Sequence, residues 1–109
     1  ILISSEEGMI RKYDSLKKAL RKAHERGVKI KFISPITAKS QKILPEIQKI
    51  ADVKNKNMNG RMCIIDNKHV TFFVSEEGAV HPSYDVGVWV NTKQFGSMLT
   101  NLVNTSIKN

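Results

Sequence analysis

The sequence predicts an α/β domain in which a mixed β-sheet is flanked by helices, in the order β-α-β-α-β-β-β-β-α. Three stretches repeat apolar residues at helical spacing, and short apolar or alternating runs lie between them. A chain of 109 residues with 40% apolar and 26% charged residues suits one domain with a single core. Its longest apolar runs, such as VTFFV, fall far short of the roughly 20 residues of a membrane span. We therefore expect a soluble protein.

The first third of the chain predicts a strand, a helix and a second strand. Residues 1–4 form a short apolar run. Residues 6–26 carry an apolar stripe with spacings of three and four, which is typical of an amphipathic helix: Met9, Tyr13, Leu16, Leu20 and Ala23. Gly27 is placed to end this helix. Residues 28–33, VKIKFI, alternate at first and then become apolar, which indicates a half-buried strand.

The middle of the chain predicts a second helix and a hairpin. Residues 37–51 have helical periodicity, but Pro45 means that the helix either starts near Leu44 or kinks there. A short strand is expected around Val53. Two apolar runs, residues 61–66 and 69–74, are joined at Asn67-Lys68 and read as a hairpin.

The end of the chain predicts a strand and a final helix. The strand covers residues 85–90, and Trp89 alternates there with valines, so we interpret it as a core residue rather than an anchor at a dimer surface. Asn91 or Thr92 can cap the helix. Its apolar face carries Phe95, Leu99, Leu102 and Val103.

The net charge of +8 raises the hypothesis of a polyanionic partner. Arg11, Lys18 and Lys22 share one face of the first predicted helix and could contact phosphates. The more ordinary interpretation is a solvated outer face, since acidic residues are interspersed among the cations. The single cysteine, Cys63, supports no disulfide and suits a reducing cytoplasm.

Residues 59–66 contain the spacing N-x-R-x-x-x-x-D, formed by Asn59, Arg61 and Asp66. Phosphodiester transfer through histidine needs an imidazole nucleophile, a cation and a carboxylate, which the phospholipase D superfamily supplies as H-x-K-x-x-x-x-D. Here asparagine replaces the histidine, and a carboxamide is not a useful nucleophile. Arg61 can still bind a phosphate or carboxylate. With Ser75, these residues form the predicted ligand site of a domain without catalytic activity.

Three longer stretches carry a resemblance: ILISSEEGMIRKYDSLKKALRKAHERGVKIKFISP, GRMCIIDNKHVTFFV and DVGVWVNTKQFGSMLTNLV. They resemble the phospholipase D-like domain of TrmB-type archaeal transcriptional regulators. The resemblance implies a phospholipase D-like fold over residues 1–109, and a role in dimerisation or effector sensing. It also implies a homodimer and a sugar or anion as effector. No cofactor is expected. DNA would be bound by an N-terminal winged helix absent from this sequence, so we expect the chain to be a piece of a longer protein.

Two alternatives remain open. The first is a phosphodiesterase or nuclease that uses His69 or His81 in place of the missing imidazole. The second is a nucleic-acid-binding module that acts through the basic helix. A metal site is not predicted, because no further ligands lie near those two histidines at suitable spacing.

Overall fold

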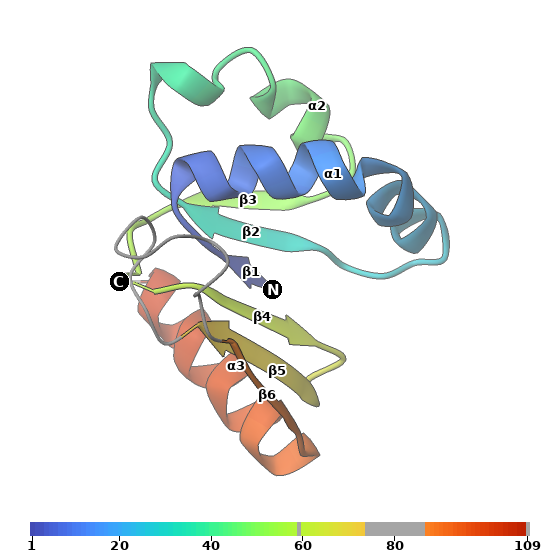
Figure 1. Ribbon diagram of the computed structural model, residues 1–109, viewed down its shortest axis with the longest axis vertical. Helices are drawn as coiled ribbons and strands as arrows, with labels where there is room; N and C mark the ends of the chain where they lie inside the picture. The colour runs from blue at the N-terminus through green and yellow to red at the C-terminus, as the bar shows by residue number, and fades with distance from the viewer. Residues whose placement is uncertain (59, 74–86, 109) are drawn as a thin grey trace.

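A computed structural model describes residues 1–58, 60–73 and 87–108 of the chain. The element order agrees with the prediction, including the mixed sheet and the flanking helices (Figure 1). The elements are β1 (Leu2–Ile3), α1 (Glu6–Glu25), β2 (Lys31–Ser34), the 3-10 turn η1 (Ala38–Ser40), α2 (Leu44–Gln48), β3 (Asp52–Asn55), β4 (Met62–Ile65), β5 (His69–Phe73), β6 (Gly87–Asn91) and α3 (Lys93–Lys108).

The six strands form one sheet in the order β3-β2-β1-β4-β5-β6. The pairs β1–β2 and β2–β3 are parallel, whereas β1–β4, β4–β5 and β5–β6 are antiparallel. The two-residue strand β1 is therefore central, and it joins a parallel half of the sheet to an antiparallel half.

Helices cover opposite faces of the two halves. Leu2 and Phe32, paired on β1 and β2, pack in the cluster that contains residues of α1 and α2. Their neighbours Ile3 and Ile33 pack against Val103 of α3. Since consecutive strand residues point to opposite faces, α3 lies across the sheet from α1 and α2. Figure 1 shows α1 over the parallel half and α3 along the antiparallel half.

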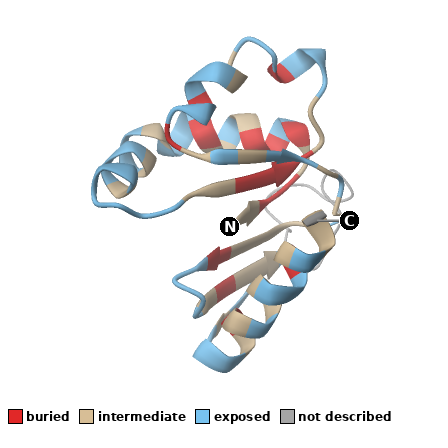
Figure 2. Cartoon of the chain, turned by 180° about the vertical axis from the view of Figure 1, so that it is seen from behind, coloured by how far each residue is buried: buried red, intermediate tan, exposed pale blue. Residues whose placement is uncertain are grey.

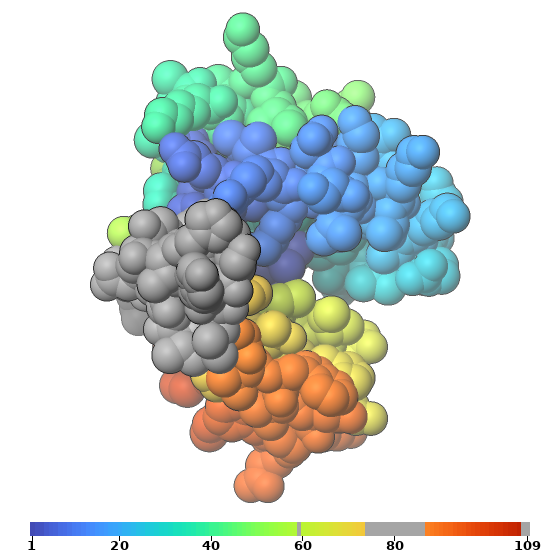
Figure 3. Space-filling model, in the orientation of Figure 1, coloured from blue at the N-terminus to red at the C-terminus, as the bar shows by residue number. Residues whose placement is uncertain are grey.

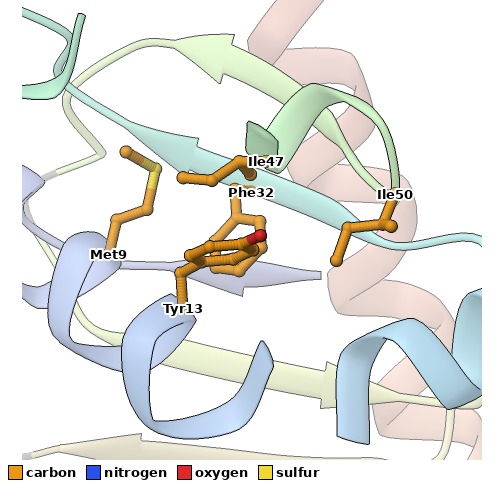
Figure 4. Close-up of a cluster of buried hydrophobic side chains, with 5 residues drawn as sticks. All are labelled: Met9, Tyr13, Phe32, Ile47 and Ile50. Atoms are coloured by element: carbon orange, nitrogen blue, oxygen red, sulfur yellow. The ribbon is translucent and has the colours of Figure 1, made fainter. Parts of the chain in front are cut away.

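The larger core cluster lies between α1, α2 and the parallel strands (Figure 4). It is built from Met9, Tyr13, Phe32, Ile47 and Ile50, of which the first four are almost completely buried. The Tyr13 hydroxyl donates to Glu46 Oε1 at 3.0 Å, so the polar end of the buried ring is satisfied. The outer faces of the helices are exposed (Figure 2).

Pro45 divides the predicted second helix. Instead of one helix over residues 37–51, the chain forms η1 and then the short helix α2, with the proline in the first turn of α2. A proline there leaves no hydrogen bond unmade, because the first N–H groups of a helix have no partner within it. Of the two options left open by the sequence, a start at Leu44 is confirmed.

Three expectations about burial and boundaries are wrong. Trp89 is 62% exposed, so it is not a core residue. Leu16 of the predicted apolar stripe is 44% exposed, because the far half of α1 extends over a groove and not over the sheet. The second strand begins at Lys31 rather than at residue 28, and Val28 is exposed.

Candidate functional site

The predicted ligand site does not assemble as one pocket within the described residues. Asn59 and Ser75 lie outside those residues. Arg61 precedes β4 and Asp66 follows it, so the whole strand separates them. Five residues of extended chain span roughly 16 Å at about 3.3 Å per residue. A ligand that contacts both side chains would have to bridge most of this length, and a cleft shared by the four residues stays a prediction.

Arg61 is held at the end of the hairpin that is far from its turn. Its guanidinium lies over the ring of Phe73, with 4.7 Å between Cζ and the ring centroid. The Phe73 N–H donates to the Arg61 carbonyl at 3.2 Å. Such cation–π packing fixes the direction of the side chain. Anion binding by Arg61 stays a prediction.

His69 lies at the other end of the same hairpin. It is paired with Ile65, and its ring stacks on Trp89 with 5.9 Å between centroids and 5° between planes. Phe73, beside Arg61, is four residues further along β5, which corresponds to roughly 13 Å. The structure therefore does not bring His69 to the cation that a phosphodiesterase would need. His81 lies outside the described residues.

Asp66 lines a groove between α1, the start of β2, the β4–β5 turn and α3, with a volume of about 1120 Å³. Figure 3 shows a hollow between the blue helix and the yellow hairpin. The wall includes apolar side chains of α1, of the segment before β2, and of β4: Leu16, Leu20, Val28, Ile30 and Ile65. Polar groups line the rest, among them Lys29, Lys31, Asn67, Thr100 and Asn104.

The β4–β5 turn is fixed in place by α3. Asp66 and Asn67 adopt positive φ angles of 56° and 54°, which aspartate and asparagine tolerate better than most residues. Gly96 of α3 lies directly against the turn, where a side chain would meet the backbone of Asn67. Thr100 Oγ1 donates to Asn67 Oδ1 at 2.8 Å. These contacts position Asp66 at the mouth of the groove.

The basic side of the groove depends on contacts between distant parts of the chain. Lys31 Nζ donates to Asn104 Oδ1 at 3.2 Å, across 73 residues of sequence. The alternation of lysines in VKIKFI indicates a polar side of this segment, but not which surface it faces. Sequence reasoning named Asp66 as a ligand residue, which stays a prediction, and it did not single out Lys29, Lys31 or Asn104, which line the same groove.

The amino group of Ile1 is buried beside this groove. It donates to the Ile64 carbonyl at 2.9 Å, and the Ile64 N–H donates to the Ile1 carbonyl at 2.8 Å. Burial lowers the pKa of this amino group below its ordinary value of 8.0; Cys63 opposes the shift, and Lys31 adds to it.

Acetylation of the Ile1 amino group is expected to stabilise the protein below pH 8. The folded pKa is lowered, so the ammonium form favours the unfolded state, and stability rises as the pH increases through the folded pKa towards 8.0. The acetylated protein keeps the N–H donor to Ile64 and loses this pH dependence. Denaturant unfolding from pH 5 to 9 measures both. Identical pH profiles for the two proteins would contradict the prediction.

The three predicted phosphate-binding cations lie on α1. Arg11, Lys18 and Lys22 are exposed and fall within a narrow arc of the helix. They extend over roughly 16 Å along the axis, at 1.5 Å per residue. On the same helix, Arg21 forms an ion pair with Glu46 at 3.2 Å. Nucleic-acid binding by this face stays a prediction.

The part of the chain that the structure describes contains no candidate metal centre and no membrane-spanning helix. There, no three His, Cys, Asp or Glu side chains converge as metal ligands. In the same residues, every helix is too short or too polar to cross a membrane.

Comparison with known proteins relates the chain to one solved structure. No protein-family model matches the sequence, and no curated protein matches it. The solved structure is that of TrmBL2, an archaeal chromatin protein described as showing a novel mode of DNA binding. The match has a TM-score of 0.66 and 20% sequence identity, and it covers 96% of this chain. It spans 41% of the TrmBL2 chain. At this identity the likeness shows that nearly the whole chain shares its α/β fold with part of TrmBL2.

Proposed function

We propose that this chain is a non-catalytic, phospholipase D-like regulatory domain of a TrmB-type transcriptional regulator. The observation that carries the proposal is the shared fold with TrmBL2, an archaeal DNA-binding protein, over 96% of the chain. This shared fold agrees with the sequence resemblance to TrmB-type regulators. DNA binding by the whole regulator is assigned to a winged helix outside this chain.

The lack of catalysis follows from the chemistry of the motif. Asn59 stands where the superfamily has its nucleophilic histidine. The one described histidine of the hairpin, His69, packs on Trp89 and lies far from Arg61. Neither Asn59 nor His69 therefore supplies a nucleophile beside a cation that could hold a phosphate.

The effector-sensing role is assigned to the groove beside Asp66. Its apolar wall, with lysines, amides and a hydroxyl around it, suits a polyhydroxylated or anionic small molecule. Lys29 and Lys31 would attract an anion, and Asn67, Thr100 and Asn104 offer hydrogen bonds to hydroxyl groups.

The chain is also proposed to act as part of a longer regulator, because its fold matches only 41% of the TrmBL2 chain. Ligand binding must therefore be measured on such a longer protein as well as on this domain.

The decisive experiment is a thermal-shift screen with sugars, sugar phosphates and inorganic phosphate. A true effector is expected to stabilise both proteins, by about 2.7 kcal/mol at 100 times its Kd. Lys29→Ala should weaken the response to an anion and Asp66→Asn the response to a neutral sugar, whereas Asp14→Asn on the outside of α1 should change neither. If no compound stabilises either protein, or if all three variants respond like the parent, the sensing role is wrong.

A further inference from the structure

One face of the antiparallel half of the sheet is largely open to solvent. Leu2 of β1 packs in the cluster under α1 and is paired with Cys63 of β4, so Cys63 points to the side on which α1 lies. Alternate residues of β4, β5 and β6 share this side, which is called the open face below. Its larger side chains are Arg61, Ile65, His69, Phe73 and Trp89. Helix α3 packs on the opposite face.

Three aromatic rings lie on the open face. The imidazole of His69 stacks on the indole of Trp89, with 5° between the two planes. The Phe73 ring lies over Gly87, where a Cβ would be 3.2 Å from Phe73 Cε1, and the Arg61 guanidinium lies over the same ring. Neighbouring groups therefore hold these rings in place. Trp89 is nevertheless 62% exposed, so much of the indole is accessible for stacking.

A basic flank of α1 borders the open face. Burial raises the pKa of the Cys63 thiol, and the charge of Lys12 is among those that lower it, so Lys12 lies near β4. Arg21, which pairs with a carboxylate of α2, lies about 180° around α1 from Lys12, at 100° per residue. The Lys12 flank therefore points away from α2. The exposed residues Arg11 and Lys22 lie about 100° and 80° from Lys12, on the solvent side of the helix.

The charges and rings together suit an unpaired nucleic-acid strand. Strands β4, β5 and β6 contain no acidic residue, so a phosphate backbone meets no repulsion from them. Flat exposed rings beside cations are the usual means of binding single strands, because every base has a π face. A duplex keeps its bases stacked inside and offers no ring to Trp89.

The dimensions of the open face favour a strand over a small ligand. Trp89 on β6 is two strands away from β4, which corresponds to roughly 10 Å at about 4.8 Å per strand. A base on Trp89 and a phosphate beside Lys12 would therefore belong to different nucleotides. Trp89 also does not line the groove assigned above to the effector, and a small ligand needs such an enclosing wall.

Polar neighbours of Trp89 favour RNA over DNA. Thr71 is paired with Trp89 across β5 and β6, and Asn91 lies two residues further along β6, so both point to the open face. Their hydroxyl and amide groups can exchange hydrogen bonds with a ribose 2′-hydroxyl, which is the group that distinguishes RNA from DNA.

We propose that the open face binds single-stranded RNA, with a base stacked on Trp89 and phosphates held by Arg61 and by the Lys12 flank of α1. This surface is separate from the groove of the proposed effector and from the winged helix to which duplex DNA binding is assigned. It adds a second nucleic-acid partner to the proposed regulator.

The sole tryptophan of the chain reports directly on this binding. The protein is titrated with an oligouridylate of about 12 nucleotides, within the usual size of a single-strand site. Trp89 emission should be quenched, and the affinity should fall with salt by a slope of about −0.7 for each phosphate contact. Uridine monophosphate, an RNA duplex of equal length and the matching DNA strand should each bind at least about fivefold more weakly. Absence of quenching at low salt, or equal binding of any of these three, would overturn the proposal.

Variants locate the contact, with binding read from the anisotropy of a labelled oligouridylate. Trp89→Ala should weaken binding at least about fivefold through the lost stacking. Leu102→Ala is the control, because Leu102 is similarly exposed on α3, across the sheet. Lys22→Ala should reduce the salt slope by about 0.7, whereas Lys42→Ala, beside Arg21 on the α2 side, should not.

Circular dichroism shows whether each variant is folded. A folded Trp89→Ala protein that binds like the parent, or a Leu102→Ala protein that is equally impaired, would contradict the assignment to the open face. Effector binding is read from thermal stability with sugars and phosphates, so either proposal can fail alone.

Discussion

Replacing Gly96 by alanine is expected to lower the free energy of unfolding by about 1–3 kcal/mol, the usual cost of forcing extra atoms into a packed site. A Cβ at Gly96 would lie 2.2 Å from the Asn67 carbonyl oxygen, 2.4 Å from its carbonyl carbon and 2.7 Å from the Lys68 nitrogen. These are backbone atoms of a tight turn, so a side-chain rotation cannot relieve the overlap. Either α3 or the turn must move.

Whether Gly96→Ala lowers or raises the free energy of unfolding distinguishes a glycine packed against the turn from an exposed helical glycine. In an exposed helix, glycine to alanine stabilises by about 1 kcal/mol through helix propensity alone. Asn101→Ala, on the exposed side of the same helix, is the matched control and should change stability by no more than about 0.5 kcal/mol. Denaturant unfolding of the three proteins gives the comparison. A Gly96→Ala protein as stable as the parent would show that α3 does not dock on the turn as described.

Replacing Glu6 by glutamine is expected to destabilise the protein at neutral pH and to flatten its acid transition. The Glu6 carboxylate accepts hydrogen bonds from Thr37 N–H at 2.6 Å, from Thr37 Oγ1 at 2.7 Å and from Ser40 Oγ at 2.5 Å. It joins the start of α1 to η1, and Ser40 is completely buried. Glutamine accepts through one oxygen and carries no charge at the helix N-terminus, so part of this network is lost.

The pH dependence follows from the direction of the pKa shift. The hydrogen bonds from Ser40 and then from Thr37 hold the pKa of Glu6 below its ordinary value of 4.5. Its contribution to stability is therefore complete above pH 4.5 and is lost as the pH falls through the lowered folded pKa. Thermal melts between pH 2 and 7 should show a shallower decline for Glu6→Gln than for the parent.

Glu7→Gln is the control for this experiment. Glu7 is the next residue of the same helix, but it is exposed and forms a surface ion pair with Lys39 at 3.6 Å. Such pairs contribute little, so this variant should follow the parent. Equal behaviour of the two variants across the whole pH range would mean that the Glu6 network is not a stabilising feature.

The order of helices and strands could be predicted because each element has a local cause. The spacing of Met9 and Tyr13 places them on one helix face, and both are buried. The hairpin follows from two apolar runs with a short polar link, and β4 and β5 lie where it was expected. Pro45 was correctly predicted to interrupt the second helical stretch, although only the tertiary structure shows that the helix starts at Leu44.

The site could not be predicted in the same way, because it depends on how elements meet. The motif spacing suggested that Arg61 and Asp66 act together, but an extended strand puts its two ends far apart. Alternation in GVWVN suits a half-buried strand, yet β6 is an edge that α1 and α2 do not reach, and so Trp89 is exposed. A strand at the edge of a sheet and a strand at its centre have the same alternating sequence pattern when only one face of the sheet is covered.

By itself, the sequence determined the α/β class and the order of the elements, since these depend on local periodicity. The tertiary structure alone decided that Asp66 belongs to a groove with Lys29 and Lys31, and that Trp89 lies on an open edge. The physical reason is the distance along the sequence over which each kind of interaction acts. Periodicity acts over a few residues, whereas the groove and the edge are created by contacts such as Lys31 with Asn104, which join residues 73 apart.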